Sequence, residues 1–189
     1  MIVAPPGEEG RAAAVAGEAG VEATTVPGGE SRSESVAAGL AAAGSALVAV
    51  HDAARPLVTP GLIDEIVEKL ASRPDAAAVI AAAPITDTVK RAREPRPEKG
   101  EVARGGPTVA KTESREHLWA AQTPQVFRAE ALREALKGDP QAIAAAGDDA
   151  MLVERAGGKV LIHPSPAENL KVTTPVDLRL AELLLAERS

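Results

Sequence analysis

ALVAVHDAARP, residues 46–56, is the stretch of the sequence that decides the fold. Its first half is short, apolar and partly β-branched and lacks a polar face, which is typical of a strand buried on both sides. Asp52 and Arg55 follow at the carboxyl end of this strand, where open α/β sheets keep their ligand crevice. Pro56 disfavours helical geometry at Arg55 and holds that residue extended, facing the crevice. Taken alone, the pair is more simply explained as a turn cap and its ion-pair partner, so other motifs have to decide.

The segments around this strand alternate between strand and helix patterns. Apolar runs predict strands at residues 1–6, 21–26, 76–83 and 159–163. Helical spacing and capping residues predict helices at residues 8–19, 31–43, 59–70, 129–138, 148–155 and 175–187. The alternation predicts a single α/β domain over residues 1–189 with a mostly parallel sheet and right-handed crossovers.

The alternation breaks between residues 85 and 118, which are rich in charge, proline and glycine. Two segments there, Thr86–Arg91 and Pro107–Thr112, contain several Thr and Val residues and predict the two arms of a β-ribbon. A disordered loop is the alternative, because an insertion of this length is usually either functional or disordered.

The composition excludes several classes of function. Aromatic residues make up 1% of the chain and the formal net charge is -6, so we expect no nucleic-acid partner. The core must be built from Ala, Val, Leu and Ile, with Trp119 and Phe127 expected inside it. No Cys is present, which excludes disulfides and thiolate chemistry. No apolar run reaches membrane-spanning length and no signal-like start is present, so we expect no membrane partner and a cytoplasmic location.

Five separated motifs carry the chemistry. They are GGESRSESV (28–36), HDAARP (51–56), DTVK (87–90), WAAQTPQVF (119–127) and NLKVT (169–173). HDAARP and QTPQVF are specific, whereas the glycine pair with its serine is weak alone. Together and in this order, the five motifs resemble the 2-C-methyl-D-erythritol 4-phosphate cytidylyltransferase family of the non-mevalonate isoprenoid pathway.

This resemblance implies a Rossmann-like nucleotidyltransferase fold with a protruding β-ribbon arm, Mg²⁺ as cofactor and CTP as co-substrate. The phosphate of methylerythritol phosphate would attack the α-phosphorus of CTP, giving CDP-methylerythritol and pyrophosphate without a covalent enzyme intermediate. The protein would then have to position two anions that repel each other and neutralise the charge between them.

The resemblance also assigns residues to the two substrates. Gly29, Glu30 and Ser35 would line the cytosine pocket, and glycine lets backbone approach a flat base. Asp52 and Ala53 would meet the ribose, with Asp52 also near the metal or the methylerythritol.

On the acceptor side, Arg55 would hold the erythritol part and Thr123 would complete its pocket. Lys171 would stabilise charge at the reacting phosphate. Thr88 and Arg115 match the family's phosphate-binding pair, which the arm of residues 85–118 carries into a partner subunit, so a homodimer would form each site.

Each of these residues also has an ordinary structural explanation. Lys171 and Arg115 would be solvated surface cations, Thr123 before Pro124 plain turn chemistry, and Ser35 a helix-surface hydroxyl. We expect His51 to orient its loop by a hydrogen bond.

Two departures from the family pattern stand out. The family's first strand and its glycine-rich CTP-binding loop are missing, which leaves either direct pairing or an unpaired seam between the strands that normally flank it. Gly147 stands where the family usually has Thr before an Asp-Asp pair. We expect either an amino-terminal truncation or a natural relic, and weak or absent CTP binding by the chain as it stands.

Two other functions stay open. A ribitol-5-phosphate cytidylyltransferase shares much of the motif set, although the double Ala of Asp52-Ala53-Ala54-Arg55 and the QTPQ run favour methylerythritol phosphate. A catalytically impaired relic that acts only as a dimeric binding protein is the non-enzymatic alternative.

Overall fold

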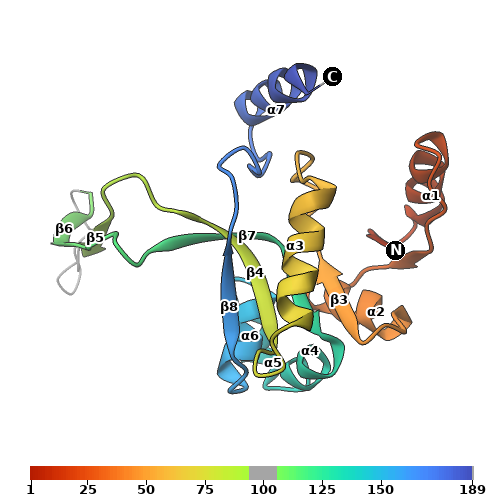
Figure 1. Cartoon of the computed structure of the whole chain (residues 1–189), viewed down its shortest axis with the longest axis horizontal. Coiled ribbons are helices and arrows are strands. Elements are labelled where there is room, and N and C mark those ends of the chain that lie inside the picture. The colour runs from red at the N-terminus through yellow and green to blue at the C-terminus, as the bar shows by residue number, and fades with distance from the viewer. Residues whose placement is uncertain (94–105, 189) are drawn as a thin grey trace, which may run out of the picture.

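A mixed four-stranded sheet forms the centre of the molecule, in a computed structural model that describes residues 1–93 and 106–188 (Figure 1). Its strand order is β3-β7-β4-β8. The four strands are β3 (Leu47–Val50), β7 (Trp119–Arg128), β4 (Ala78–Pro84) and β8 (Val160–Pro164).

Three strands of the central sheet run in one direction, as the alternating pattern predicts. β4 pairs in parallel with β8, whereas β7 lies antiparallel between β3 and β4. β7 is antiparallel because the chain leaves β4, runs out along the arm and returns directly beside β4, which is the way a hairpin pairs its strands. The sequence pattern predicts no strand for residues 119–128, so β7 and its direction are known from the structure alone.

Helices cover both faces of this sheet. On one face, α3 (Pro60–Ala71) packs Leu62, Ile66 and Leu70 against β4 and β7. On the other face, α4 (Ala129–Ala135) and α6 (Asp149–Arg155) surround Phe127, and the short α5 (Pro140–Ala144) connects them. The core is aliphatic, as the composition predicts. Phe127 is fully buried, but the expectation for Trp119 is wrong, because its strand leaves the core there and 36% of Trp119 is exposed.

The amino-terminal strands form a second, separate sheet. β1 (Ile2–Ala4) pairs in parallel with β2 (Thr25–Pro27), flanked by α1 (Glu9–Glu18) and α2 (Arg32–Ala42). Among the described residues, β1 pairs with no strand of the central sheet. A cavity of about 540 Å³ lies between β1 and the central sheet, lined by residues of β1, α2 and β3. Of the two expected outcomes, the structure therefore has an unpaired seam between β1 and β3, and these two strands do not pair directly.

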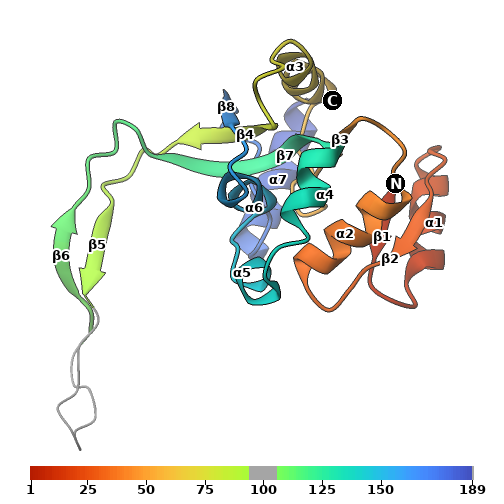
Figure 2. The same cartoon turned by 90° about the horizontal axis from the view of Figure 1, so that it is seen from below.

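Residues 85–93 and 106–118 project from the body as an arm (Figure 2). Its two strands, β5 (Lys90–Arg93) and β6 (Thr108–Thr112), pair antiparallel, which confirms the predicted ribbon. Every side chain of both strands is exposed. The tip predicted between them lies outside the described residues.

The last helix, α7 (Pro175–Glu187), lies apart from the central sheet (Figure 1). Thr174 caps it, and Asp177 closes a capping box. Arg188 ties its end to the body by donating to the Leu57 carbonyl at 2.8 Å. In the part of the chain that the structure describes, no helix is long and apolar enough to span a membrane.

Candidate active site

Asp52, at the end of β3, lies at the centre of a cationic rim. Its Oδ2 is 3.0 Å from Lys171 Nζ and 3.8 Å from Arg55 Nε. Its Oδ1 is 3.9 Å from Arg32 Nε. The structure thus brings together Asp52, Arg55 and Lys171, which are far apart in the sequence, as the position of the strand end and the motifs predict.

Arg55 is held in place by its surroundings. It is buried, and its Nη1 donates to the backbone carbonyl of Asn169 at 2.8 Å. Burial lowers the pKa of the Arg55 guanidinium, and the charge of Asp52 opposes this shift. The side chain therefore presents a fixed positive charge to the rim.

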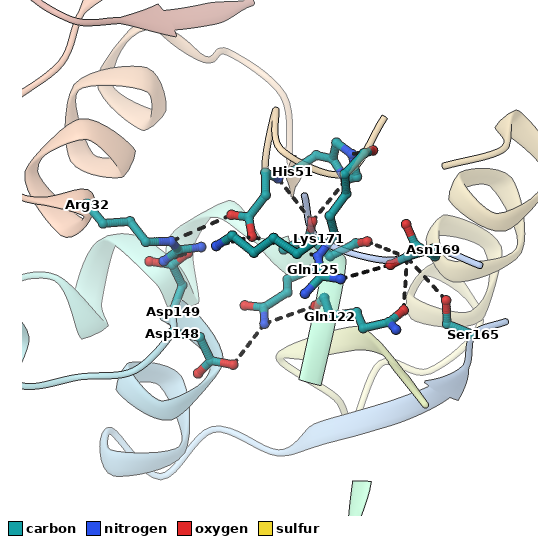
Figure 3. Close-up of polar contacts among 12 residues, drawn as sticks. Arg32, His51, Gln122, Gln125, Asp148, Asp149, Ser165, Asn169 and Lys171 are labelled. Atoms are coloured by element: carbon teal, nitrogen blue, oxygen red, sulfur yellow. Dashed lines mark hydrogen bonds and ion pairs between the residues drawn. The ribbon is translucent and has the colours of Figure 1, made fainter. Parts of the chain in front are cut away.

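The segment that carries Lys171 is bound to the loop after β3 and to the middle of β7. Val172 N–H donates to the Ala54 carbonyl at 2.7 Å. Asn169, which is buried, shares its amide N–H groups with Gln122 Oε1, Ser165 Oγ and the Thr123 carbonyl, at 2.9 to 3.2 Å (Figure 3). Sequence reasoning gave Asn169 no role, although it stands two residues before Lys171 in the NLKVT motif.

A chain of directed hydrogen bonds orders the loop after β3. His51 Nε2 donates to the Arg55 carbonyl at 3.1 Å, because a carbonyl oxygen can only accept. In the neutral ring Nδ1 is then the acceptor, so Thr123 Oγ1 donates to His51 Nδ1 at 3.0 Å while it accepts from Asp52 N–H at 3.0 Å. His51 orients the loop, as expected. The hydroxyl of Thr123 is already used inside the protein, so it fixes the backbone of Asp52.

Arg32 and Asp149 form an ion pair that sequence reasoning missed. Arg32 Nη1 donates to Asp149 Oδ2 at 2.7 Å, and Asp149 is fully buried. Burial raises the pKa of the Asp149 carboxyl, and the positive charge of Arg32 opposes that rise. The two residues are 117 positions apart. The available sequence signals were the GGESRSESV motif, which contains Arg32, and the Asp-Asp pair, which contains Asp149, and neither signal indicates that the two residues pair.

The glycine-rich segment before α2 packs closely against that helix. Ser35 Oγ accepts from Gly29 N–H at 3.1 Å and donates to the Ser31 carbonyl at 3.0 Å. A Cβ on Gly28 would lie 2.7 Å from Ser35 Oγ, and one on Gly29 would lie 2.3 Å from Glu34 Cβ. Both glycines are therefore required by the close approach of the segment to α2.

Two cavities meet at the rim. The first, of about 540 Å³ between β1 and β3, is lined by Ser35, Ala53 and residues of these two strands. The second has about 360 Å³ and is lined by Arg55, Thr123, Gly147, Lys171 and their neighbours. Arg32 and Asp52 line both cavities and so stand between them.

Four of the expected site residues do not face these cavities within one chain. Gly29 and Glu30 are exposed beside the first cavity and do not line it. Thr88 and Arg115 are exposed on the arm and line neither cavity. Arg115 Nη1 instead donates to the Thr86 carbonyl.

The donor set at the rim fits an anion better than a resident metal ion. Within residues 1–93 and 106–188, no three His, Cys, Asp or Glu side chains come together in a way that could hold a metal. Both oxygens of Asp52 face cations. A Mg²⁺ ion would thus take fewer than three ligands of these types from the described residues and its other ligands from phosphates and water, which is how Mg²⁺ usually binds.

The sheet, the crevice at the end of β3 and the cationic rim define an α/β domain of the nucleotidyltransferase type. Residues 1–187 match the family model described as IspD: 2-C-methyl-D-erythritol 4-phosphate cytidylyltransferase. The chain belongs to this family.

Individual relatives agree with the family match. The chain is 42% identical over 185 residues to the bifunctional enzyme IspD/IspF of Anaeromyxobacter dehalogenans, covering 98% of this chain and 45% of that protein. It is 44% identical over 168 residues to the 2-C-methyl-D-erythritol 4-phosphate cytidylyltransferase of Pelotomaculum thermopropionicum, covering 88% of this chain and 65% of that protein. The chain therefore spans less than two thirds of the length of these curated relatives.

A solved structure also matches. The crystal structure of 2-C-methyl-D-erythritol 4-phosphate cytidylyltransferase from Thermus thermophilus superposes with a TM-score of 0.70 at 35% identity. The match covers 87% of this chain and 73% of that chain. It supports the nucleotidyltransferase fold expected from the motifs.

Proposed function

We propose that this protein transfers a cytidylyl group from CTP to 2-C-methyl-D-erythritol 4-phosphate, giving CDP-methylerythritol and pyrophosphate. The observation that carries the proposal is the convergence of Arg55 and Lys171 on Asp52 where β3 ends. In this reaction a phosphate oxygen of the acceptor forms a bond to the α-phosphorus of CTP as the bond to pyrophosphate breaks. No proton has to move, so the protein acts by placing charges.

The roles follow from the positions of the residues. Lys171 has the half-exposed ammonium at the rim and would stabilise charge on the reacting phosphate. Arg55 and Asp52 would hold the erythritol part, and Thr123 would keep Asp52 in place. Ser35 and Ala53, which line the first cavity, would face the nucleotide. Gly29 and Glu30 do not line this cavity and would meet the nucleotide from its exposed side.

A homodimer would complete each site. Thr88 and Arg115 belong to the arm that projects from the body (Figure 2) and line neither cavity of their own chain, so these residues would reach the phosphate of a ligand in a partner subunit. A cytoplasmic location is part of the proposal, because both substrates are small polar molecules.

Mg²⁺ would come with the nucleotide. Asp52 is the candidate ligand, and the ion would supply positive charge to the phosphates. Calorimetric titration of the protein with MgCl₂ should therefore show weak binding without CTP and tighter binding with it; equally tight binding without nucleotide would mean that the protein holds the ion alone.

The direct test is an assay of pyrophosphate release from CTP, with methylerythritol phosphate and ribitol 5-phosphate offered separately. At CTP concentrations high enough to offset the weak CTP binding expected from the sequence, we expect turnover with methylerythritol phosphate and loss of that turnover in Asp52→Asn. Turnover only with ribitol 5-phosphate would replace the acceptor that we propose.

A relic that only binds ligands is the second candidate, because Arg32 is the only Lys or Arg side chain among the described residues that line the first cavity, of about 540 Å³. Calorimetry separates the two: binding of methylerythritol phosphate with no CTP binding and no turnover would establish the relic, whereas turnover excludes it.

A further inference from the structure

We propose that Arg32 is a phosphate-binding residue, which acts with Lys171 to hold a substrate phosphate beside Asp52. The ligand class is a phosphate ester or anhydride, from the nucleotide or from the acceptor. The inference deepens the proposed function and rests on it.

The position of Arg32 is the first observation. It is the first residue of α2, directly after the Ser31 cap, and its side chain reaches Asp52 after β3 and Asp149 in α6. It lines both cavities, and 40% of its side chain is exposed. An anion that extends from one cavity into the other has to pass this guanidinium.

The Arg32 guanidinium is held by a hydrogen bond through Nη1, whereas Nη2 is available to a ligand. Nη1 is engaged by Asp149 at 2.7 Å, while Nε lies 3.9 Å from Asp52. Nη2 has no hydrogen bond to any residue that the structure describes. Because guanidinium groups carry five N–H donors in a rigid plane, this edge can bind a further anion without rearranging.

Asp149 explains why Arg32 stays in this place. A buried carboxylate is costly unless a cation pairs with it, and Arg32 is the cation within reach of Asp149 among the described residues. The pair therefore holds the guanidinium at the rim before any ligand arrives, which reduces the ordering cost of binding.

Lys171 supplies the second cation of the arrangement. In Figure 3, the side chains of Arg32 and Lys171 extend toward one another from opposite sides. Both approach Asp52, Lys171 at 3.0 Å and Arg32 at 3.9 Å. Two cations that face each other repel, and one carboxylate offsets only part of this. A phosphate between them would offset the rest.

Asp148, the other carboxylate that lines the second cavity, does not compete for Arg32 and Lys171. Asp148 lines the second cavity, but its Oδ2 accepts from Gln125 Nε2 and its Oδ1 from Met151 N–H, each at 2.9 Å. The rim therefore keeps unpaired donors on Arg32 while its carboxylates are occupied.

The test is ligand binding by a variant that does not leave a buried charge. Arg32→Gln combined with Asp149→Asn replaces the ion pair with a neutral pair of similar shape, and thermal unfolding checks that it folds. Calorimetry then measures binding of inorganic pyrophosphate, CTP and methylerythritol phosphate, with cytidine and unphosphorylated methylerythritol as uncharged counterparts. Arg11→Gln, which is exposed in α1, is the matched control.

We expect affinity for at least one phosphorylated ligand to fall about tenfold or more, with less than a twofold change for the uncharged counterparts. A fall with pyrophosphate and CTP assigns the nucleotide phosphates, and a fall with methylerythritol phosphate assigns the acceptor. Arg32→Lys, which keeps the pair with Asp149 but loses the free Nη2, should show the same fall and serves as the second variant.

Unchanged affinity for every phosphorylated ligand in both variants would overturn the inference and leave Arg32 a structural partner of Asp149, while the proposed function would stand. Absence of binding by the unaltered protein to any phosphorylated ligand would overturn the inference and the proposed function together.

Discussion

At the scale of single residues, Lys171 should matter for turnover and hardly for folding. Its ammonium is half exposed, and such ion pairs contribute about 0–1 kcal/mol to stability. Removing a charge that acts on the reacting phosphate costs about 100-fold or more in turnover. Lys171→Ala should therefore lower kcat/KM strongly and leave the denaturant midpoint nearly unchanged. Lys137→Ala, an exposed ion-paired lysine in another part of the molecule, is the control; equal turnover in both variants would remove Lys171 from the site.

Gly147 offers a gain-of-function test. A Cβ at this position would meet only Met151 Cε, at 3.9 Å, and the residue lines the second cavity. Gly147→Thr should therefore be tolerated and should add a hydroxyl at the acceptor pocket. We expect methylerythritol phosphate to bind about threefold to tenfold more tightly, the value of one added hydrogen bond. Gly61→Thr, whose Cβ would face open space in α3, is the control for calorimetry; weaker binding in Gly147→Thr would mean that the hydroxyl blocks the pocket.

The candidate site was predictable only in part at this scale. Asp52 and Arg55 could be placed because polar residues after an apolar strand lie at the ligand edge of a sheet, and Lys171 because its motif matched a family. The expectation that this strand is buried on both sides is wrong, because β3 is the edge strand of its sheet and none of its residues is fully buried. The pairing of Arg32 with Asp149 could not be predicted, because no spacing rule connects residues on different helices 117 positions apart. The occupied hydroxyl of Thr123 depends likewise on the placement of β7 beside the loop after β3.

At the scale of elements, the start of α7 should depend on pH through Asp177. Its Oδ2 accepts from Thr173 N–H and Thr174 N–H, and these bonds lower the pKa of Asp177 to about 2. A carboxyl with a lowered pKa stabilises the fold above its unfolded value near 3.8, and this contribution is lost as pH falls toward 2. Asp177→Ala should thus weaken α7 at pH 7, and the difference from the unaltered protein should shrink below about pH 4.

Amide hydrogen exchange of α7, measured from pH 7 downward, checks this expectation. Asp64→Ala is the control, because Asp64 is exposed in α3 and has no hydrogen-bonded side chain among the described residues. A difference that stays constant with pH would show that the carboxylate charge of Asp177 does not stabilise the helix.

Helix starts were more predictable than strand directions. Thr59-Pro60 and Thr174-Pro175 begin α3 and α7 because a capping hydroxyl and a proline at the first turn act locally. The antiparallel direction of β7 depends on where the chain returns from its arm, which no local pattern encodes. The resemblance to the family left open whether the strands beside β3 pair directly or leave an unpaired seam, and no local pattern could decide between the two.

At the scale of the whole molecule, the exposed arm predicts a dimer. A two-stranded ribbon is marginally stable alone in water, yet β5 and β6 extend from the body with every side chain exposed, including Val109 (Figure 2). Contact with a second copy of the chain would cover it. We therefore expect the protein to be a dimer by light scattering, and a form without the arm to be a monomer.

The arm can be removed without disturbing the sheet that anchors it. Pro84 in β4 is paired with Trp119 in β7, and Ile85 N–H donates to the Leu118 carbonyl at 3.1 Å. A short Asn-Gly turn can therefore replace residues 86–117 and close a hairpin. Val15→Asp, which adds a charge at an equally exposed apolar position on α1, is the control and should stay dimeric. An armless form that remains a dimer would place the interface elsewhere, because the surface removed would then have contributed nothing to association.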